Sequence, residues 1–151
     1  MSFISLELED LLQALNQLTQ DKQPSWGQMS AQRMVEHLNE MIQMSMNPSH
    51  GIPLQIPADK IPSMLDFLSS DKPIIQNFKA SFVPEEAPLK HEEIELAVDE
   101  FIDVWLAYED FAAENPDAII LHPYYGDLNI EQWKRMHQKH ITHHFKQFGI
   151  F

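Results

Sequence analysis

The stretch NIEQWKRMHQKHITHHFKQF, residues Asn129–Phe148, decides how the rest of the chain is organised. It carries four of the protein's eight histidines. At about 100° per residue, His137, His140 and His144 fall within an arc of about 60° on one face of a helix. His140 and His144 are four residues apart, so both rings rise from that face and can close on one ion. The stretch therefore predicts a helix that carries a metal site.

The histidine pair lies among apolar side chains, which indicates that its face of the helix is buried in a bundle. Two adjacent buried imidazoles need hydrogen-bonding partners or a shared ion, because unpaired polar groups in a core are costly. Two alternatives remain: a pair of partly exposed surface histidines, or a hydrogen-bonded core network without metal. The apolar neighbours are Trp133, Met136, Ile141 and Phe148.

Three further stretches have the three- and four-residue apolar period of amphipathic helices. Ser30 and Asn129 are the expected N-caps of the helices that follow them. No segment of useful length has the alternation of a β-strand. The predicted helices, besides the last, cover about Leu6–Gln20, about Ala31–Met46 and about His91–Glu114.

Residues 47–89 separate the second of these helices from the third, and they hold seven of the ten prolines. Proline blocks long helices, but apolar residues persist here, so we expect an ordered crossover with one or two short helices. Four amphipathic helices and one long crossover predict an all-α fold, a four-helix bundle. The length of 151 residues suits a single domain spanning 1–151.

A third metal ligand should come from a facing helix, and His37 is the histidine of another long helix that lies away from its ends. Three histidines leave a coordination position open, as in catalytic zinc sites. The alternative for a lone histidine is a hydrogen-bonded place in the core. Glu36 and Glu40, on the predicted solvated side of that helix, could accept from a ligand imidazole or act as bases.

The remaining histidines receive weaker assignments. His137 could support a ligand or replace one, whereas His143 turns away from the arc and is predicted to lie at the surface. His50 and His91 are expected to be solvent-exposed, and His122, before Pro123, is expected to play a structural part in a turn.

Composition excludes several classes of function. The formal net charge is −13, which repels phosphate backbones and disfavours nucleic acid as a partner. The chain has no cysteine, so thiolate ligands and disulfides are excluded. No apolar run approaches the length of a membrane span, and the first residues are acidic where a signal peptide would be basic. We therefore expect a cytoplasmic protein without a membrane partner.

Two stretches, PSWGQMSAQRMVEHLNEM (Pro24–Met41) and HPYYGDLNIEQWKRMHQKHITHHFKQFG (His122–Gly149), resemble the DinB-like four-helix bundle superfamily. The likeness is to a branch with a Trp-Gly-x-Met helix start, a His-Pro-aromatic-aromatic-Gly turn and a Lys-His-x-x-His-His helix. The two stretches cover about a third of the chain. This chain has Tyr124-Tyr125 where the branch often has Phe, and Lys146 where Arg is usual.

The resemblance implies a divalent metal, often zinc or nickel, bound by His37, His140 and His144. It also implies thiol-dependent chemistry, so the chain is expected to be a metal-dependent thiol S-transferase or a hydrolase acting on a small molecule. Its partner would be a small thiol or electrophile, and a homodimer is compatible with the family. Candidate catalytic groups are Glu36, Glu40 and Tyr124. The alternative is a non-catalytic bundle whose histidines stabilise the contact between the second and last helices.

Overall fold

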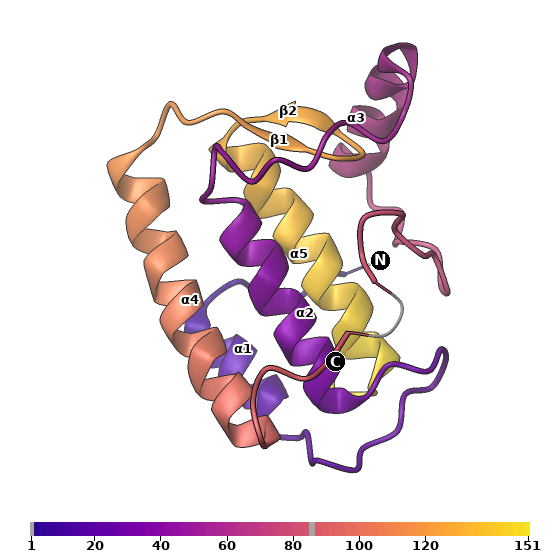
Figure 1. Cartoon of the computed structure of the whole chain (residues 1–151), viewed down its shortest axis with the longest axis vertical. Helices are drawn as coiled ribbons and strands as arrows, with labels where there is room; N and C mark the ends of the chain where they lie inside the picture. Colours follow the sequence, from indigo (N-terminus) through magenta and orange to yellow (C-terminus); the bar gives the residue numbers. More distant parts are fainter. Residues whose placement is uncertain (1, 85–86) are drawn as a thin grey trace.

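The structure is a computed structural model that describes residues 2–84 and 87–151 (Figure 1). Over those residues the protein is mostly helical, and its β-structure is one two-stranded hairpin. In the same residues no helix is both long and apolar enough to cross a membrane. The elements in chain order are α1 (Leu8–Leu15), α2 (Ala31–Met44), the 3₁₀ turn η1 (Ala58–Lys60), α3 (Ile61–Ser69), α4 (Ile94–Glu114), β1 (Ile120–His122), β2 (Gly126–Leu128) and α5 (Ile130–Gln147).

Helix α2 lies between α4 and α5, while α1 packs on α4 and α3 packs on α5 (Figure 1). Burial of apolar side chains between these elements is the main term that holds the helices together. One cluster joins α1, α2, α4 and α5 and includes Leu11, Leu38, Phe101, Trp105 and Phe145. A second cluster lies under the hairpin and α3 and includes Met41, Met44, Leu68, Leu128 and Trp133.

The two predicted N-caps are confirmed. The Ser30 hydroxyl accepts a hydrogen bond from the Arg33 backbone N–H, and α2 begins at the next residue. Asn129 and Gln132 form a reciprocal capping box with both bonds at 2.9 Å. Both helices that carry the histidines therefore begin at positions defined by local side-chain chemistry, which fixes the rotation of their histidine faces.

Helix α1 is shorter than the sequence predicted, because it ends at Leu15 instead of continuing to Gln20. The side chain of Gln20 has other partners: its amide donates to Gln32, and its carbonyl oxygen accepts from the Ile94 N–H at the start of α4. A glutamine that bridges two other helices cannot also lie on the outer face of α1. The apolar period alone could not reveal that the Gln20 side chain would form hydrogen bonds with residues outside α1.

The hairpin between α4 and α5 was not predicted. Its strands are three residues each, paired antiparallel from Ile120 opposite Leu128 to His122 opposite Gly126, which is too short for an alternating pattern to be recognised. Gly126 has a φ of +79°, and a Cβ there would lie 2.9 Å from the Ile61 side chain. The Trp133 indole N–H donates to the Ile120 carbonyl at 2.9 Å and fixes the hairpin on α5.

The part of the crossover that the structure describes contains the short helices η1 and α3, as predicted. Cationic side chains of α5 bind the carbonyl end of α3, where a helix has unpaired acceptors. Arg135 donates to the Leu68 carbonyl at 3.2 Å and to the Ser70 carbonyl at 2.8 Å. Lys139, which is 1% exposed, donates to the Phe67 carbonyl, and burial lowers the pKa of its ammonium to about 8.

Candidate metal centre

Three imidazoles converge where α2 faces α5. His37 comes from α2, and His140 and His144 come from successive turns of α5. The Nε2 atom of His140 lies 3.0 Å from that of His37 and 3.1 Å from that of His144. One nitrogen from each ring can be chosen so that all three lie within 4.8 Å of one another. The structure thus brings together the three residues that the sequence singled out.

Burial keeps these imidazoles neutral. His37 and His144 are 6% and 7% exposed, and His140 is half-buried. Burial lowers the pKa of His37 to about 4, and the positive charge of Arg33 contributes in the same direction. Burial and the neighbouring imidazoles hold the pKa values of His140 and His144 well below the usual range. At neutral pH each ring therefore has a free lone pair, the form in which histidine binds metals.

The hydrogen bonds around the cluster decide which nitrogen of His144 has the lone pair. The amide N–H of Gln147 donates to the Trp26 carbonyl at 3.0 Å, so its oxygen faces the His144 Nδ1 at 2.8 Å. That Nδ1 must carry the proton and donate, which leaves the His144 Nε2 as an acceptor pointing at the cluster. The Nδ1 of His37, by contrast, is buried and has no hydrogen-bond partner within residues 2–84 and 87–151.

This geometry fits a divalent ion. In a tetrahedral site with metal–nitrogen distances of about 2.0–2.1 Å, the ligand nitrogens stand about 3.3–3.4 Å apart. The two Nε2 separations, 3.0 and 3.1 Å, are somewhat shorter than that value, and the three nitrogens together lie within 4.8 Å. Without an ion, a proton can bridge one of the two nitrogen–nitrogen contacts as a hydrogen bond. The other contact then leaves lone pairs facing each other. The three histidines could therefore hold a metal ion.

Gln147 is the residue of this site that the sequence analysis missed. Besides its contacts to His144 and Trp26, its backbone carbonyl accepts from the Ser25 N–H at 2.7 Å. Gly27 lets this loop approach closely, because its φ is +75° and a Cβ there would lie 3.1 Å from the Gln147 amide nitrogen. The available signal was the three-residue spacing from His144, which places both side chains on one face of the helix.

The two other histidines of α5 lie outside the cluster. His137 is 2% exposed, its Nε2 is 2.8 Å from the Ser45 hydroxyl, and its ring lies 4.9 Å from that of Tyr108. His143 was predicted to be a surface residue, but it is half-buried. Its ring contacts that of Trp26 at 5.6 Å, and a hydrogen bond to the Ile74 backbone opposes the lowering of its pKa by burial.

His50 and His91 are also half-buried, not solvent-exposed as predicted. The His50 Nε2 donates to the Leu121 carbonyl at 2.7 Å and so ties the crossover to the hairpin. His91 contacts Glu100 at 3.3 Å. His122 has the expected structural position, 3% exposed, with its Nδ1 accepting from the Tyr124 N–H.

On the side of α2 that was predicted to be solvated, Glu40 is exposed as expected, but Glu36 is only 2% exposed, so the prediction is wrong for Glu36. The Glu36 carboxylate accepts from the N–H groups of Lys90 and His91 at 2.7 and 3.1 Å. Burial raises the pKa of Glu36, but these bonds and that from Gln32 outweigh it and lower the pKa overall. Glu36 therefore anchors the end of the crossover.

Glu40 and Tyr124, the other candidate catalytic groups, have different interaction partners. Glu40 is exposed and forms a two-pronged ion pair with Arg33 at 2.8 and 3.0 Å. Its charge also reaches the cluster, since it raises the pKa of His37 against the effect of burial. The Tyr124 hydroxyl lies 2.8 Å from both the N–H and the hydroxyl of Ser81. Glu40 is thus the candidate that acts on a cluster residue.

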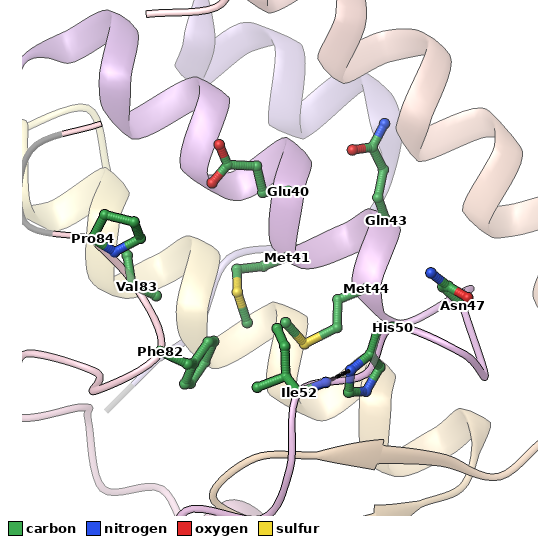
Figure 2. Close-up of a pocket in the computed structure, with 10 residues that line it drawn as sticks. All are labelled: Glu40, Met41, Gln43, Met44, Asn47, His50, Ile52, Phe82, Val83 and Pro84. Carbon is green, nitrogen blue, oxygen red and sulfur yellow. Dashed lines mark hydrogen bonds between the residues drawn. The ribbon is translucent and has the colours of Figure 1, made fainter. Parts of the chain in front are cut away.

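A pocket of about 320 Å³ lies beside α2, beginning one helical turn after His37 (Figure 2). Figure 2 shows Met41 and Met44 facing Phe82 and Ile52 across it, with the Glu40 carboxylate at its edge. Most of its contact surface is apolar, and its anionic side chain, Glu40, comes one helical turn after His37 on α2.

The fold and the site together define the class of this protein: it is mostly helical, and three imidazoles converge between two helices, where they could hold one ion. The chain belongs to the family described as "Protein of unknown function (DUF1569)", whose model matches residues 2–149. No curated protein and no solved structure matches the chain.

Proposed function

We propose that the protein is a DinB-like four-helix bundle that binds one divalent ion, zinc or nickel, through His37, His140 and His144. We further propose that it is a metal-dependent enzyme acting on a small molecule, either transferring a thiol to an electrophile or hydrolysing its substrate. The observation that carries the metal site is the convergence of the three imidazole nitrogens within 4.8 Å. The packing of α1 and α2 on α4, and of α2 on α5, supports the bundle.

The chemistry of the donors supports catalysis. Three neutral imidazoles leave a coordination position open, and a bound divalent ion there would act as a Lewis acid that lowers the pKa of a water or thiol. Gln147 would keep His144 in the tautomer that presents Nε2 to the ion. The loop containing Trp26 would limit the access of water, since it is fixed to Gln147 on the same side.

The pocket beside α2 supports the binding of a small, largely apolar substrate. Met41 and Phe82 would contact its apolar part, and the carboxylate of Glu40 lies at the edge. Among the three candidate catalytic groups, Glu40 is the best placed to accept a proton, because Glu36 and Tyr124 are engaged elsewhere. Glu40 would have to release Arg33 to do so.

A non-catalytic role is the alternative, and one observation favours it. The ligands join α2 to α5, and two of the three are more than nine-tenths buried, as in a structural site. Here the ion would stabilise the contact between these helices, in a monomer or a homodimer. Removing the metal would then lower the melting temperature, and no turnover would accompany its return.

The first test is metal content by elemental analysis of untagged protein, because a histidine tag would add sites. We expect close to one zinc or nickel ion per wild-type chain and almost none in His140→Ala. His91→Ala is the matched control, since it removes a half-buried histidine from outside the cluster. No stoichiometric metal in the wild type, even after zinc or nickel is added near pH 7.5, would refute the site.

A second test separates the enzyme from the structural alternative. Wild-type protein stripped of metal and then reloaded would be assayed with low-molecular-weight thiols against an electrophile panel, and with ester and amide substrates. Turnover that rises with bound metal and is lost in His140→Ala supports the enzyme. A metal-loaded protein with a higher melting temperature and no turnover on either panel supports the structural role.

A further inference from the structure

A second cleft, of about 690 Å³, lies between the last turns of α4 and the first turns of α5. The segment before α1 borders it at Leu6 and Glu7. None of the three cluster histidines lines it, so it is separate from the candidate metal centre. Its walls include the apolar side chains of Ala112, Ile119 and Ile130, which suits the flanks of a small organic molecule.

Two buried donors at this cleft have no hydrogen-bond partner among the residues that the structure describes. Trp105 and Tyr108 both line it and are 2% and 1% exposed, yet the indole nitrogen of one and the hydroxyl of the other are unpaired. Buried polar groups are paired in the great majority of cases, because an unpaired one loses its hydration without compensation. The other buried indole, that of Trp133, shows the usual arrangement, donating to the Ile120 carbonyl.

The Tyr108 hydroxyl acts as a donor. Burial raises its pKa well above the usual value, and the charge of Glu131 adds to this, so the proton stays on the oxygen. Glu131, like Tyr108, lines the cleft. The indole N–H of Trp105 has no acceptor capacity. Both groups therefore call for an acceptor atom on a ligand.

The charges around the cleft select against anions. Four carboxylates and one ammonium line it, and the side chain of Asn129 is already used in the capping box of α5. The net negative rim would repel an anionic ligand at short range, whereas it would not repel a neutral or a cationic ligand. The charged residues are Glu7, Glu109, Asp117, Glu131 and Lys134.

From these observations we propose that the cleft between α4 and α5 is a binding site for a neutral or cationic small organic molecule with a carbonyl-type acceptor. The acceptor takes hydrogen bonds from the Trp105 indole and the Tyr108 hydroxyl. The apolar part of the ligand packs against Ala112 and Ile130, and a cationic group, where present, lies at the carboxylate rim. This site does not depend on the metal centre or on the proposed activity.

The test uses three probes that share an acetanilide core and differ in charge: acetanilide, 4-(aminomethyl)acetanilide and 4-acetamidobenzoate. The chain has three tryptophans, so a ¹H–¹⁵N spectrum contains three indole signals, and Trp105→Phe assigns the relevant one. We expect the Trp105 signal to shift saturably with the neutral and cationic probes. The anionic probe should bind at least about tenfold more weakly than the neutral probe. The Trp133 signal should stay in place because its hydrogen bond is internal.

Three variants sharpen the result. Ala112→Leu narrows the cleft and retains both donors, whereas Tyr108→Phe removes one donor and keeps the ring. Both should weaken binding of the neutral probe at least about tenfold. Leu106→Ala, an exposed position on the same helix, should leave binding unchanged. The Trp133 signal reports in each case whether the fold is intact. No Trp105 shift with any probe, a shift unchanged in Ala112→Leu, or contact of the Trp105 indole with water only would overturn the proposal.

Discussion

Acidification should destabilise the metal-free protein well above the pH at which carboxylates titrate. His37, His122 and His137 are buried, and burial lowers their pKa values to about 4, 3 and 3, from 6.5 in the unfolded chain. Below pH 6.5 the unfolded state therefore binds protons that the folded state excludes. The stability is fully present above that pH and is lost as the pH falls towards the folded-state values.

The magnitude follows from the same pKa values. Consider a histidine with an unfolded pKa of about 6.5 and a folded pKa of about 4 or lower. It lowers the free energy of unfolding by about 0.06 kcal/mol at pH 7.5 and by about 1.4 kcal/mol at pH 5.5. Between pH 7.5 and pH 5.5, three such residues therefore lower the free energy of unfolding by about 4 kcal/mol, which is a large part of the typical stability of a domain. The result depends almost entirely on the unfolded pKa, because pH 5.5 lies well above the folded values. His140 and His144 change stability in the same direction.

The assay is urea unfolding of metal-free protein at pH 7.5 and 5.5, followed by circular dichroism. His122→Asn, which retains an acceptor for the Tyr124 N–H, should reduce the difference between the two pH values by about 1.3 kcal/mol. Leu106→Ala, an exposed position without a titratable group, is the control and should leave the difference nearly unchanged. If the free energy of unfolding of the wild type differed by less than about 1 kcal/mol between the two pH values, the assignment of these histidines as buried and neutral would be wrong.

Three further predictions concern single contacts. Gln147→Leu should weaken metal binding about 10- to 100-fold, measured against a chelator, because the His144 tautomer is no longer fixed. Gly126→Ala should cost about 2 kcal/mol or more in urea unfolding, since the left-handed backbone is strained and the new methyl group meets Ile61. Arg135→Ala should speed proteolysis after α3 about tenfold, because two carbonyls lose their charged donor.

Each of these predictions has a matched control. Gln138→Leu changes α5 away from the cluster and should leave metal affinity unchanged; equal losses in both variants would remove the special role of Gln147. Gly149→Ala has a similar backbone strain, with φ of +67°, but no atom within 4 Å of the new methyl group, so it should cost less than Gly126→Ala. Lys134→Ala should not alter proteolysis after α3, and an equal acceleration would contradict the capping argument.

Local chemistry accounts for what could be predicted from the sequence. The Ser30 and Asn129 caps and the apolar period of α4 depend on residues within a few positions of one another. The spacing of His140 and His144 likewise follows from the helix itself. His37 could be chosen because few histidines lie within long helices, and packing of α2 on α5 then brought it to the pair.

What could not be predicted depends on partners far away in the chain. Glu36 looked solvated because nothing near it in the sequence indicates that the Lys90 and His91 N–H groups will cover it. His143 is half-buried because segments more than 60 residues earlier pass over it, at Trp26 and Ile74. The hairpin escaped recognition because its strands are only three residues long.

The three histidines of the cluster are unevenly spaced along the chain, and this has a consequence for how the proposed metal site would assemble. His140 and His144 are joined by one helical turn, whereas His37 is separated from His140 by 103 residues. A nascent α5 can therefore chelate an ion before the rest of the chain has folded, and His37 arrives only after a long loop has closed. Binding through the pair alone would be weak, and the gain in affinity on adding the third ligand would report the docking of α2. Metal uptake measured during refolding would thus show two stages, the second of which coincides with completion of the native core.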